Sequence, residues 1–287
     1  MKAPSVCIYL LVSGKKTMLK ELKDEFEKIY KECEAKTKDE NDVQSFMEEN
    51  TQLIPRVFLL NHGVNLHTVF TKVAIGDAYK SDFMLITKST AQWRCIHIEI
   101  ENPIRKPFTK NGELTSEFTH AMGQINSWKS TLANPTQQLA FADKVKKTFA
   151  EGLRENPIDH KFVLVFGRRD DLNYDKKKQW QSLSDDSIKV MTFDSLFEND
   201  ENRDRKLHLA KFVDNSVKIV TMNGVFDGAS FAAFLNPADF QFKKSDVDKM
   251  IEERKKLQEN TDEFFKKSTE DYENKIIRKL GQIPTYG

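Results

Sequence analysis

The chain has 287 residues, and its 45 Lys and Arg against 44 Asp and Glu give a formal net charge of +1. This balance excludes a general polycation, so any nucleic-acid binding would use local basic patches. No apolar run approaches the roughly 20 residues of a membrane helix, and run 6–12 lacks a small-residue cleavage site, so we expect neither a membrane span nor a signal peptide. Three cysteines without a Cys-x-x-Cys pair exclude a disulfide framework and a cysteine-type zinc site, and they fit the reducing cytoplasm.

The first predicted elements form an N-terminal extension over residues 1–41, with a strand and then a helix. The helix is predicted over 17–35, because its apolar residues are spaced by three and four: Leu19, Leu22, Phe26, Ile29 and Cys33. Such a stripe fits either a helix docked on its own domain or a short coiled coil with another chain, and its short length favours docking. The polar stretch 36–41 is a predicted linker.

The central region, residues 42–200, alternates predicted helices and strands. Beta-branched and aromatic content indicates the strands, and helical periodicity with Ser116 as a cap and Asn134-Pro135 as a stop indicates the helices. We predict strands at 56–60, 69–75, 82–87, 93–101, 160–166 and 188–192, and helices at 42–50, 116–132, 137–151 and 194–197. The predicted class is therefore α/β, with a mixed central sheet flanked by helices.

The last region, residues 201–287, is predicted to hold a hairpin and a long helix. Asn223-Gly224 between apolar runs is typical of a tight hairpin turn joining 217–222 to 225–227. A polar helix is predicted over 245–280, with Gly281 as its stop. Helices this polar usually contact a partner at a few points, so the terminal helices suggest a homo-oligomer.

The strand over 93–101 carries the most informative pattern. Alternation puts Ile96, Ile98 and Ile100 on one face, and it puts His97, Glu99 and Glu101 on the other. Neighbouring carboxylates repel unless a cation lies between them, and Mg²⁺ or Mn²⁺ prefers such oxygen ligands. The alternative is a half-exposed strand with a solvated acidic face, and on either reading we expect His97 to be an ordinary, satisfied polar residue.

Two further residues favour the metal-site reading. A hairpin of strands 82–87 and 93–101 would bring Asp82 to the end of the sheet near Glu99. On helix 116–132, Gln124 lies one turn before Trp128 and borders the predicted buried stripe. An amide there is suited to bind a water, a metal ligand or a phosphate.

Asp82, Glu99-Ile-Glu101 and Gln124-x-x-x-Trp128 together resemble the PD-(D/E)XK nuclease superfamily, with Trp in place of the Tyr of its Gln-x-x-x-Tyr branch. Over roughly residues 43–197 the chain more specifically resembles the Shedu anti-phage defence nucleases. Six segments occur in the order of that family: 46–54 (FMEENTQLI), 81–86 (SDFMLI), 98–103 (IEIENP), 121–128 (AMGQINSW), 162–169 (FVLVFGRR) and 188–196 (IKVMTFDSL).

The resemblance implies a restriction-endonuclease-like core and a divalent-metal-dependent endonuclease that cuts or nicks DNA in bacterial defence. Asp82 and Glu99 would hold Mg²⁺ or Mn²⁺, and Gln124 would assist from the following helix. An outer ligand would come from Glu48 or Glu49, between which the sequence does not decide. The ion would polarise the scissile phosphate and offset charge on the leaving oxygen.

One departure from the superfamily pattern leaves rival functions open. A lysine is expected two residues after Glu99, and this chain has Glu101. Glu101 would then ligate a second metal or act as a base, with Lys80, Lys106 or Lys129 supplying the charge. The main rival is a degenerate member that binds DNA or a phage component and acts through oligomerisation. Another is an assembly protein whose acidic strand is only surface.

Basic residues near the predicted sheet are the candidates for DNA contact. Arg168 and Arg169 follow a predicted buried strand, which places them at a sheet edge, and Lys106 and Lys129 lie near the acidic motifs. Phosphate contacts of this kind give affinity that depends on salt and little on sequence.

Overall fold

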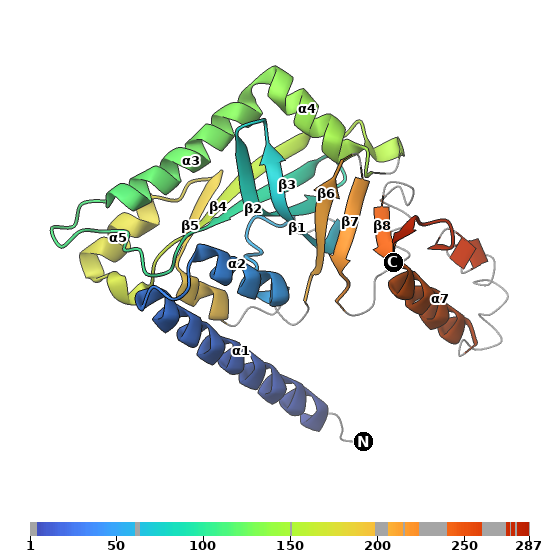
Figure 1. The fold of residues 1–287 in the computed structure, drawn as a ribbon, viewed down its shortest axis with the longest axis horizontal. Helices are drawn as coiled ribbons and strands as arrows, with labels where there is room; N and C mark the ends of the chain where they lie inside the picture. Colours follow the sequence, from blue (N-terminus) through green and yellow to red (C-terminus); the bar gives the residue numbers. More distant parts are fainter. Residues whose placement is uncertain are drawn as a thin grey trace. The chain divides into compact units, whose positions relative to one another are not determined.

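A computed structural model of the chain describes residues 5–60, 64–149, 151–198, 206–214, 216–223, 240–259, 274–275, 277–278 and 280–286 (Figure 1). The chain divides into two compact units, each built from separated segments. The first unit comprises residues 1–58, 97–128 and 161–206, and the second comprises residues 59–96, 129–160 and 207–287. The boundaries predicted at residues 41 and 200 stay predictions.

The fold is α/β with a mixed sheet, as predicted. Its strands follow the order β5-β4-β3-β2-β1-β6-β7-β8-β9. The pairs β1–β2 and β6–β7 are antiparallel, whereas β1–β6, β4–β5, β7–β8 and β8–β9 are parallel. The strand bounds are β1 Val64–Ile75, β2 Tyr79–Lys88, β3 Trp93–Ile100, β4 Ile158–Val165, β5 Ile188–Met191, β6 His208–Val213, β7 Ser216–Thr221, β8 Phe240–Lys243 and β9 Thr285–Tyr286.

Helices and short 3-10 turns connect these strands. The α-helices are α1 Ser5–Glu34, α2 Glu40–Glu49, α3 Ser116–Ala133, α4 Pro135–Lys146, α5 Tyr174–Ser182 and α7 Lys244–Glu259. The 3-10 turns are η1 Thr51–Leu53, η2 Glu151–Leu153, η3 Arg169–Asp171 and η4 Phe193–Phe197. Of the predicted helix over 245–280, the stretch 260–273 lies outside the described residues.

In the first unit, α1 is docked on its own unit. The five residues of its predicted apolar stripe are all buried, and Phe26 stacks on Phe193 of η4 at 5.4 Å between ring centroids. Helix α2 lies beside α1 (Figure 1), and Phe46 of α2 contacts Phe26 at 6.1 Å. The stripe at 19–33 therefore packs within the chain, as docking predicts. The strand expected at the N-terminus is wrong, because helix α1 already begins at Ser5.

Two other local predictions in the first unit are wrong for identifiable reasons. Residues 56–60 form a turn instead of a strand, and Phe58 has a left-handed φ of 64°, which is rare for a phenylalanine. Helix α3 is capped by Thr115 instead of Ser116, since the Thr115 hydroxyl accepts a hydrogen bond from the Phe118 amide. Residues 110–112 form a turn before this helix, and Gly112 there has φ 86°.

In the second unit, a turn at Gly76-Asp77 joins β1 to β2. Gly76 has φ 59°, a conformation that favours glycine. Strand β6, which the sequence analysis missed, pairs with β7 through a turn at Asp214. The second strand of the hairpin predicted at Asn223-Gly224 lies outside the described residues. Asn134 ends α3 and also caps α4, because its side chain accepts from two amides of that helix.

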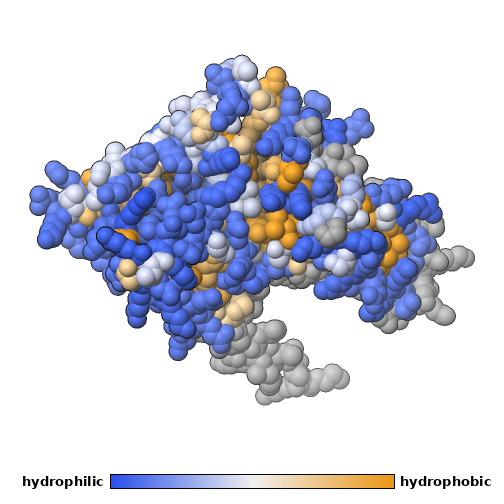
Figure 2. Space-filling view, in the orientation of Figure 1, coloured by the Kyte–Doolittle hydropathy of each residue, from blue (hydrophilic) through white to orange (hydrophobic). Residues whose placement is uncertain are grey.

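Hydrophilic side chains dominate the face of the molecule drawn in Figure 2. Within the described part of the chain, no helix is both long and apolar enough to cross a membrane.

Candidate functional site

The acidic residues of β3 are buried instead of solvated. Both faces of the strand are covered, and only 7% of Glu99 and 5% of Glu101 is exposed. The alternative of a solvated acidic face is therefore wrong. His97 is also fully buried and stacks on Phe162 at 5.5 Å, which agrees with a structural role. Burying a carboxylate costs several kcal/mol unless it is paired, so each of the two glutamates needs a compensating partner.

Glu99 finds one partner in Gln124, as its place on helix α3 predicted. The Gln124 side-chain amide donates to Glu99 Oε1 at 2.6 Å, within the first unit. The helix is held against the unit by its fully buried residues Ala121, which precedes Gln124, and Ile125 and Trp128, which follow it. The amide is thus aimed at the carboxylate by the packing of its own helix.

Glu101 has a different partner, one that the sequence analysis missed. The Arg105 guanidinium donates to Glu101 Oε2 through Nη1, and the same nitrogen lies 3.9 Å from Glu40 Oε2 of α2. A buried carboxylate two residues from Glu99, on the same strand face, is therefore neutralised by an arginine of the following loop. An acidic residue followed by a basic one at i+4 was the available sequence signal.

The two glutamates predicted as outer ligands differ in their surroundings. Glu48 is half-buried and accepts a hydrogen bond from the Gln44 side chain at 3.0 Å, whereas Glu49 is exposed. Glu40, Gln44 and Glu48 are spaced by four residues and so share one face of α2. That is also the face on which Arg105 contacts Glu40. Glu48 is the better candidate, and Glu49 points to solvent.

Asp82 belongs to the second unit, where it has a partner of its own. Lys72 of β1 donates to Asp82 Oδ1 at 2.7 Å, and the carboxylate is 8% exposed while the lysine is half exposed. The β1–β2 register pairs Thr71 with Phe83 and Val73 with Ser81, which places Lys72 opposite Asp82. Counting outward from the turn at Gly76-Asp77 would have predicted this pair.

The family model for the Shedu protein SduA, C-terminal region, matches residues 37–197, more than half of the chain. The chain belongs to the Shedu SduA family. The family resemblance inferred from six ordered segments is thereby confirmed, and family membership implies a role in anti-phage defence. No curated protein matches the chain.

The donor chemistry of this Shedu site fits a hard divalent cation. In the first unit, the carboxylate and amide oxygens of Glu99, Glu48 and Gln124 are the ligand types that Mg²⁺ and Mn²⁺ prefer. Among the residues with described positions, no three His, Cys, Asp or Glu side chains gather closely enough to hold an ion. Magnesium is commonly held by only one or two carboxylates, with water and phosphate oxygens completing its shell. The chemistry of the residues present therefore fits an ion whose shell is completed by oxygens from outside the protein.

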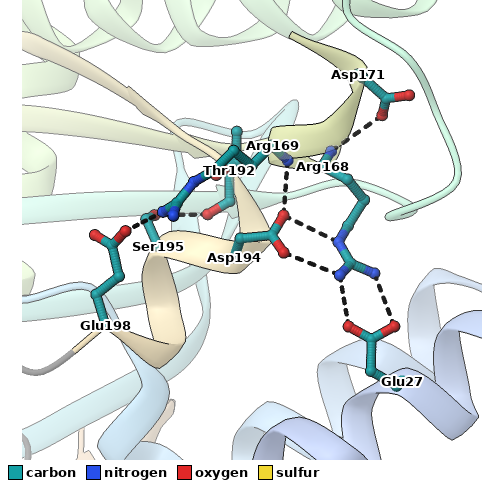
Figure 3. Close-up of polar contacts among 8 residues, drawn as sticks. All are labelled: Glu27, Arg168, Arg169, Asp171, Thr192, Asp194, Ser195 and Glu198. Carbon is teal, nitrogen blue, oxygen red and sulfur yellow. Dashed lines mark hydrogen bonds and ion pairs between the residues drawn. The ribbon is translucent and has the colours of Figure 1, made fainter.

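The arginines predicted to contact DNA have other partners in this Shedu chain. Arg168 donates to Glu27 of α1 at 2.5 Å and to Asp194 of η4 at 2.9 and 3.0 Å (Figure 3). Its guanidinium also lies 4.7 Å from the Tyr30 ring centroid, and only 13% of the side chain is exposed. Arg168 thus joins α1 to the end of the sheet.

Figure 3 also shows that Arg169 donates to Glu198, and its backbone amide donates to Asp194 at 2.7 Å. The other two predicted contacts are exposed lysines. Lys106 lies 3.3 Å from Asp171, and Lys129 is on the surface of α3. Their contact with DNA stays a prediction.

Proposed function

We propose that this Shedu protein is a divalent-metal-dependent endonuclease that cuts or nicks DNA, on a restriction-endonuclease-like core. The observation that carries the proposal is the buried Glu99 carboxylate, to which Gln124 donates at 2.6 Å. Replacing a buried polar pair by apolar residues is often neutral or stabilising, so fold stability alone gives little reason to keep it. Buried ionisable groups with a fixed orientation are typical of functional sites.

In this proposal each residue has a limited task. Glu99 and Asp82 would hold the cation, whose chemistry would be charge stabilisation at the scissile phosphate and the leaving oxygen. Gln124 fixes the orientation of the Glu99 carboxylate, as second-shell partners of metal ligands commonly do. Glu48, which accepts a hydrogen bond from Gln44, would act as an outer ligand from α2. The proposal requires the Asp82 carboxylate to share the ion, with Lys72 giving up part of its ion pair.

The test is nicking of supercoiled plasmid DNA with Mg²⁺ or Mn²⁺. Asp82→Ala and Glu99→Ala should each reduce nicking by at least about 100-fold, since each removes a ligand from the site. Glu113→Ala, which removes an exposed carboxylate of the same chain, is the matched control and should nick like the wild type. Equal nicking by wild type and both site variants would contradict the proposal.

One observation favours a second candidate function. Glu101 replaces the expected lysine, and it is ion-paired with Arg105. A degenerate member would bind DNA or a phage component and act through homo-oligomerisation. Wild-type protein that binds DNA yet leaves plasmid intact in both metals would support this alternative.

A further inference from the structure

We propose that Arg105 is a phosphate-binding residue of the site, and that Glu101 is the positioning residue that holds it. The inference rests on the proposed DNA substrate. It assigns to Arg105, which lies outside the nuclease motif, the positive charge that the superfamily pattern expects from a lysine at position 101. It also gives Glu101 a role other than metal ligand or base.

The first support is the way in which Arg105 is held. Its Nη1 contacts both Glu101 Oε2 and Glu40 Oε2, so one edge of the guanidinium is fixed by carboxylates from two elements. Glu101 is almost fully buried, whereas the Arg105 side chain is 40% exposed. The arginine therefore extends from a buried anchor toward solvent, and that anchor lies two residues after Glu99 in the chain.

The second support is the donor capacity that remains. A guanidinium has five N–H donors in a fixed planar fork. Both described contacts of Arg105 use Nη1, and within the described part of the chain Nε and Nη2 bond to no other group. These two nitrogens form the edge that binds two oxygens of one phosphate in bidentate fashion. A surface arginine serving only stability would not need this exposed edge.

The third support is the rigidity of the loop that carries the residue. The Arg105 amide donates to the Asn102 carbonyl at 3.0 Å, and the Thr115 hydroxyl donates to the Lys106 carbonyl at 2.7 Å. Gly167 packs on the other side, where an added Cβ would lie 3.1 Å from the Arg105 carbonyl oxygen. A cation on a fixed loop binds a phosphate with little loss of conformational entropy.

The charges explain why Glu101 is compatible with this role. A lysine at position 101 would itself place a positive charge beside the phosphate. Glu101 instead holds the guanidinium of Arg105 there and fixes its orientation. Two consequences follow for variants of Glu101. Losing this carboxylate should weaken DNA binding, although it removes a negative charge that repels phosphate. It should leave metal binding intact, because Glu101 is engaged by the arginine.

The test measures duplex DNA binding by fluorescence anisotropy in EDTA across a salt series. Arg105→Ala should lower the affinity several-fold and reduce the slope of log K against log salt by about 1, the loss of one phosphate contact. Arg105→Lys should keep that slope, because the charge remains, while the affinity falls with the lost fork geometry. Lys38→Ala, which removes a similarly exposed cation paired with Glu32, is the matched control and should change neither quantity.

Glu101→Ala separates positioning from metal binding. Its DNA affinity should fall, and titration calorimetry with Mn²⁺ alone should match the wild type. An unchanged salt slope in Arg105→Ala would overturn the inference, and so would lost Mn²⁺ binding with unchanged DNA affinity in Glu101→Ala. Thermal unfolding of each variant checks that it folds. If Arg105→Ala does not fold, the affinity of Arg105→Lys still tests the inference.

The outcomes also separate this inference from the proposed nuclease. DNA binding that depends on Arg105 but is not accompanied by nicking would contradict the proposed nuclease activity and support phosphate binding by Arg105. Equal nicking by Arg105→Ala and the wild type would support the nuclease activity and contradict phosphate binding by Arg105. Wild-type protein that binds no DNA would overturn the phosphate site directly.

Discussion

Two glutamates on one strand are kept buried by different means. Glu99 accepts from the neutral amide of Gln124, and Glu101 pairs with the cation of Arg105. The amide of Gln124 is a neutral donor and cancels no charge, whereas the guanidinium of Arg105 neutralises Glu101. The difference in partner therefore separates the candidate metal ligand from the positioning residue, although the two side chains are chemically identical.

Histidines in the second unit give the fold a residue-scale sensitivity to acid. Burial lowers the pKa of His208 to about 4, helped by the nearby His67, and the His208 Nδ1 accepts from the Asn223 amide at 3.1 Å. Burial likewise lowers the pKa of His160 to about 4. Both histidines are neutral in the folded protein at pH 7, and His208 is hydrogen-bonded in that form.

From this we predict how stability changes with pH. Between pH 6.5 and 4 the unfolded chain binds a proton at His208 that the folded chain excludes, so stability falls as pH falls and is intact above that window. Each histidine should contribute a loss on the order of 3 kcal/mol across it. In His208→Asn, whose side-chain oxygen still accepts at the Nδ1 position, about half of the loss should disappear. Urea unfolding against pH measures this.

The matched control for that prediction is the exposed His120, whose replacement by Asn should leave the pH curve unchanged. A His208→Asn curve that runs parallel to the wild type would show that His208 does not carry the effect.

At the scale of elements, the structure depends on short connections that fix the ends of strands. Arg168 follows β4 and joins η4 to α1 through Asp194 and Glu27 (Figure 3). Burial works against the charge of Asp194, but hydrogen bonds from Arg168 and from the Arg169 amide outweigh it and lower the pKa of that carboxyl. Gly167, one residue earlier, packs against the loop of Arg105. The α1 contact and the proposed phosphate site thus meet at the end of one strand.

Gly167→Ala should lower the stability of the fold by more than the strain of its backbone conformation alone would. Gly167 has φ 64°, and an added Cβ would lie 2.9 Å from Pro107 Cδ. Gly112 has φ 86° with nothing within 4 Å of an added Cβ, so Gly112→Ala reports backbone strain only. Strain of this kind costs about 1 kcal/mol, and we expect Gly167→Ala to lose about 2 kcal/mol more, measured by urea unfolding. Equal losses of stability in Gly167→Ala and Gly112→Ala would contradict close packing around Gly167.

The elements that could be predicted from sequence are those whose local pattern agrees with their packing. The 3-4 spacing from Leu19 to Cys33 predicted the docked part of α1, and alternation predicted the apolar isoleucine face of β3, which is buried. The turn conformation of Phe58 is set by its surroundings, so the strand expected there was wrong. The partners of Arg168 are 26 and 141 residues away in sequence, a separation that no local pattern encodes.

For the molecule as a whole, family membership and site geometry carry different parts of the account. The family match over 37–197 covers both Asp82 and Glu99, and it gives the role in defence. Metal dependence, DNA as substrate, a cytoplasmic location and homo-oligomerisation stay predictions. The central claim is that Glu99, oriented by Gln124, holds a catalytic cation together with Asp82.

A crystal structure of the wild-type chain grown with Mn²⁺, with the ion located by its anomalous scattering, tests that claim most directly. We predict one ion bound by the carboxylates of both Glu99 and Asp82, with Glu101 still paired to Arg105. An ion bound elsewhere, or Asp82 and Glu99 too far apart to share one, would contradict it.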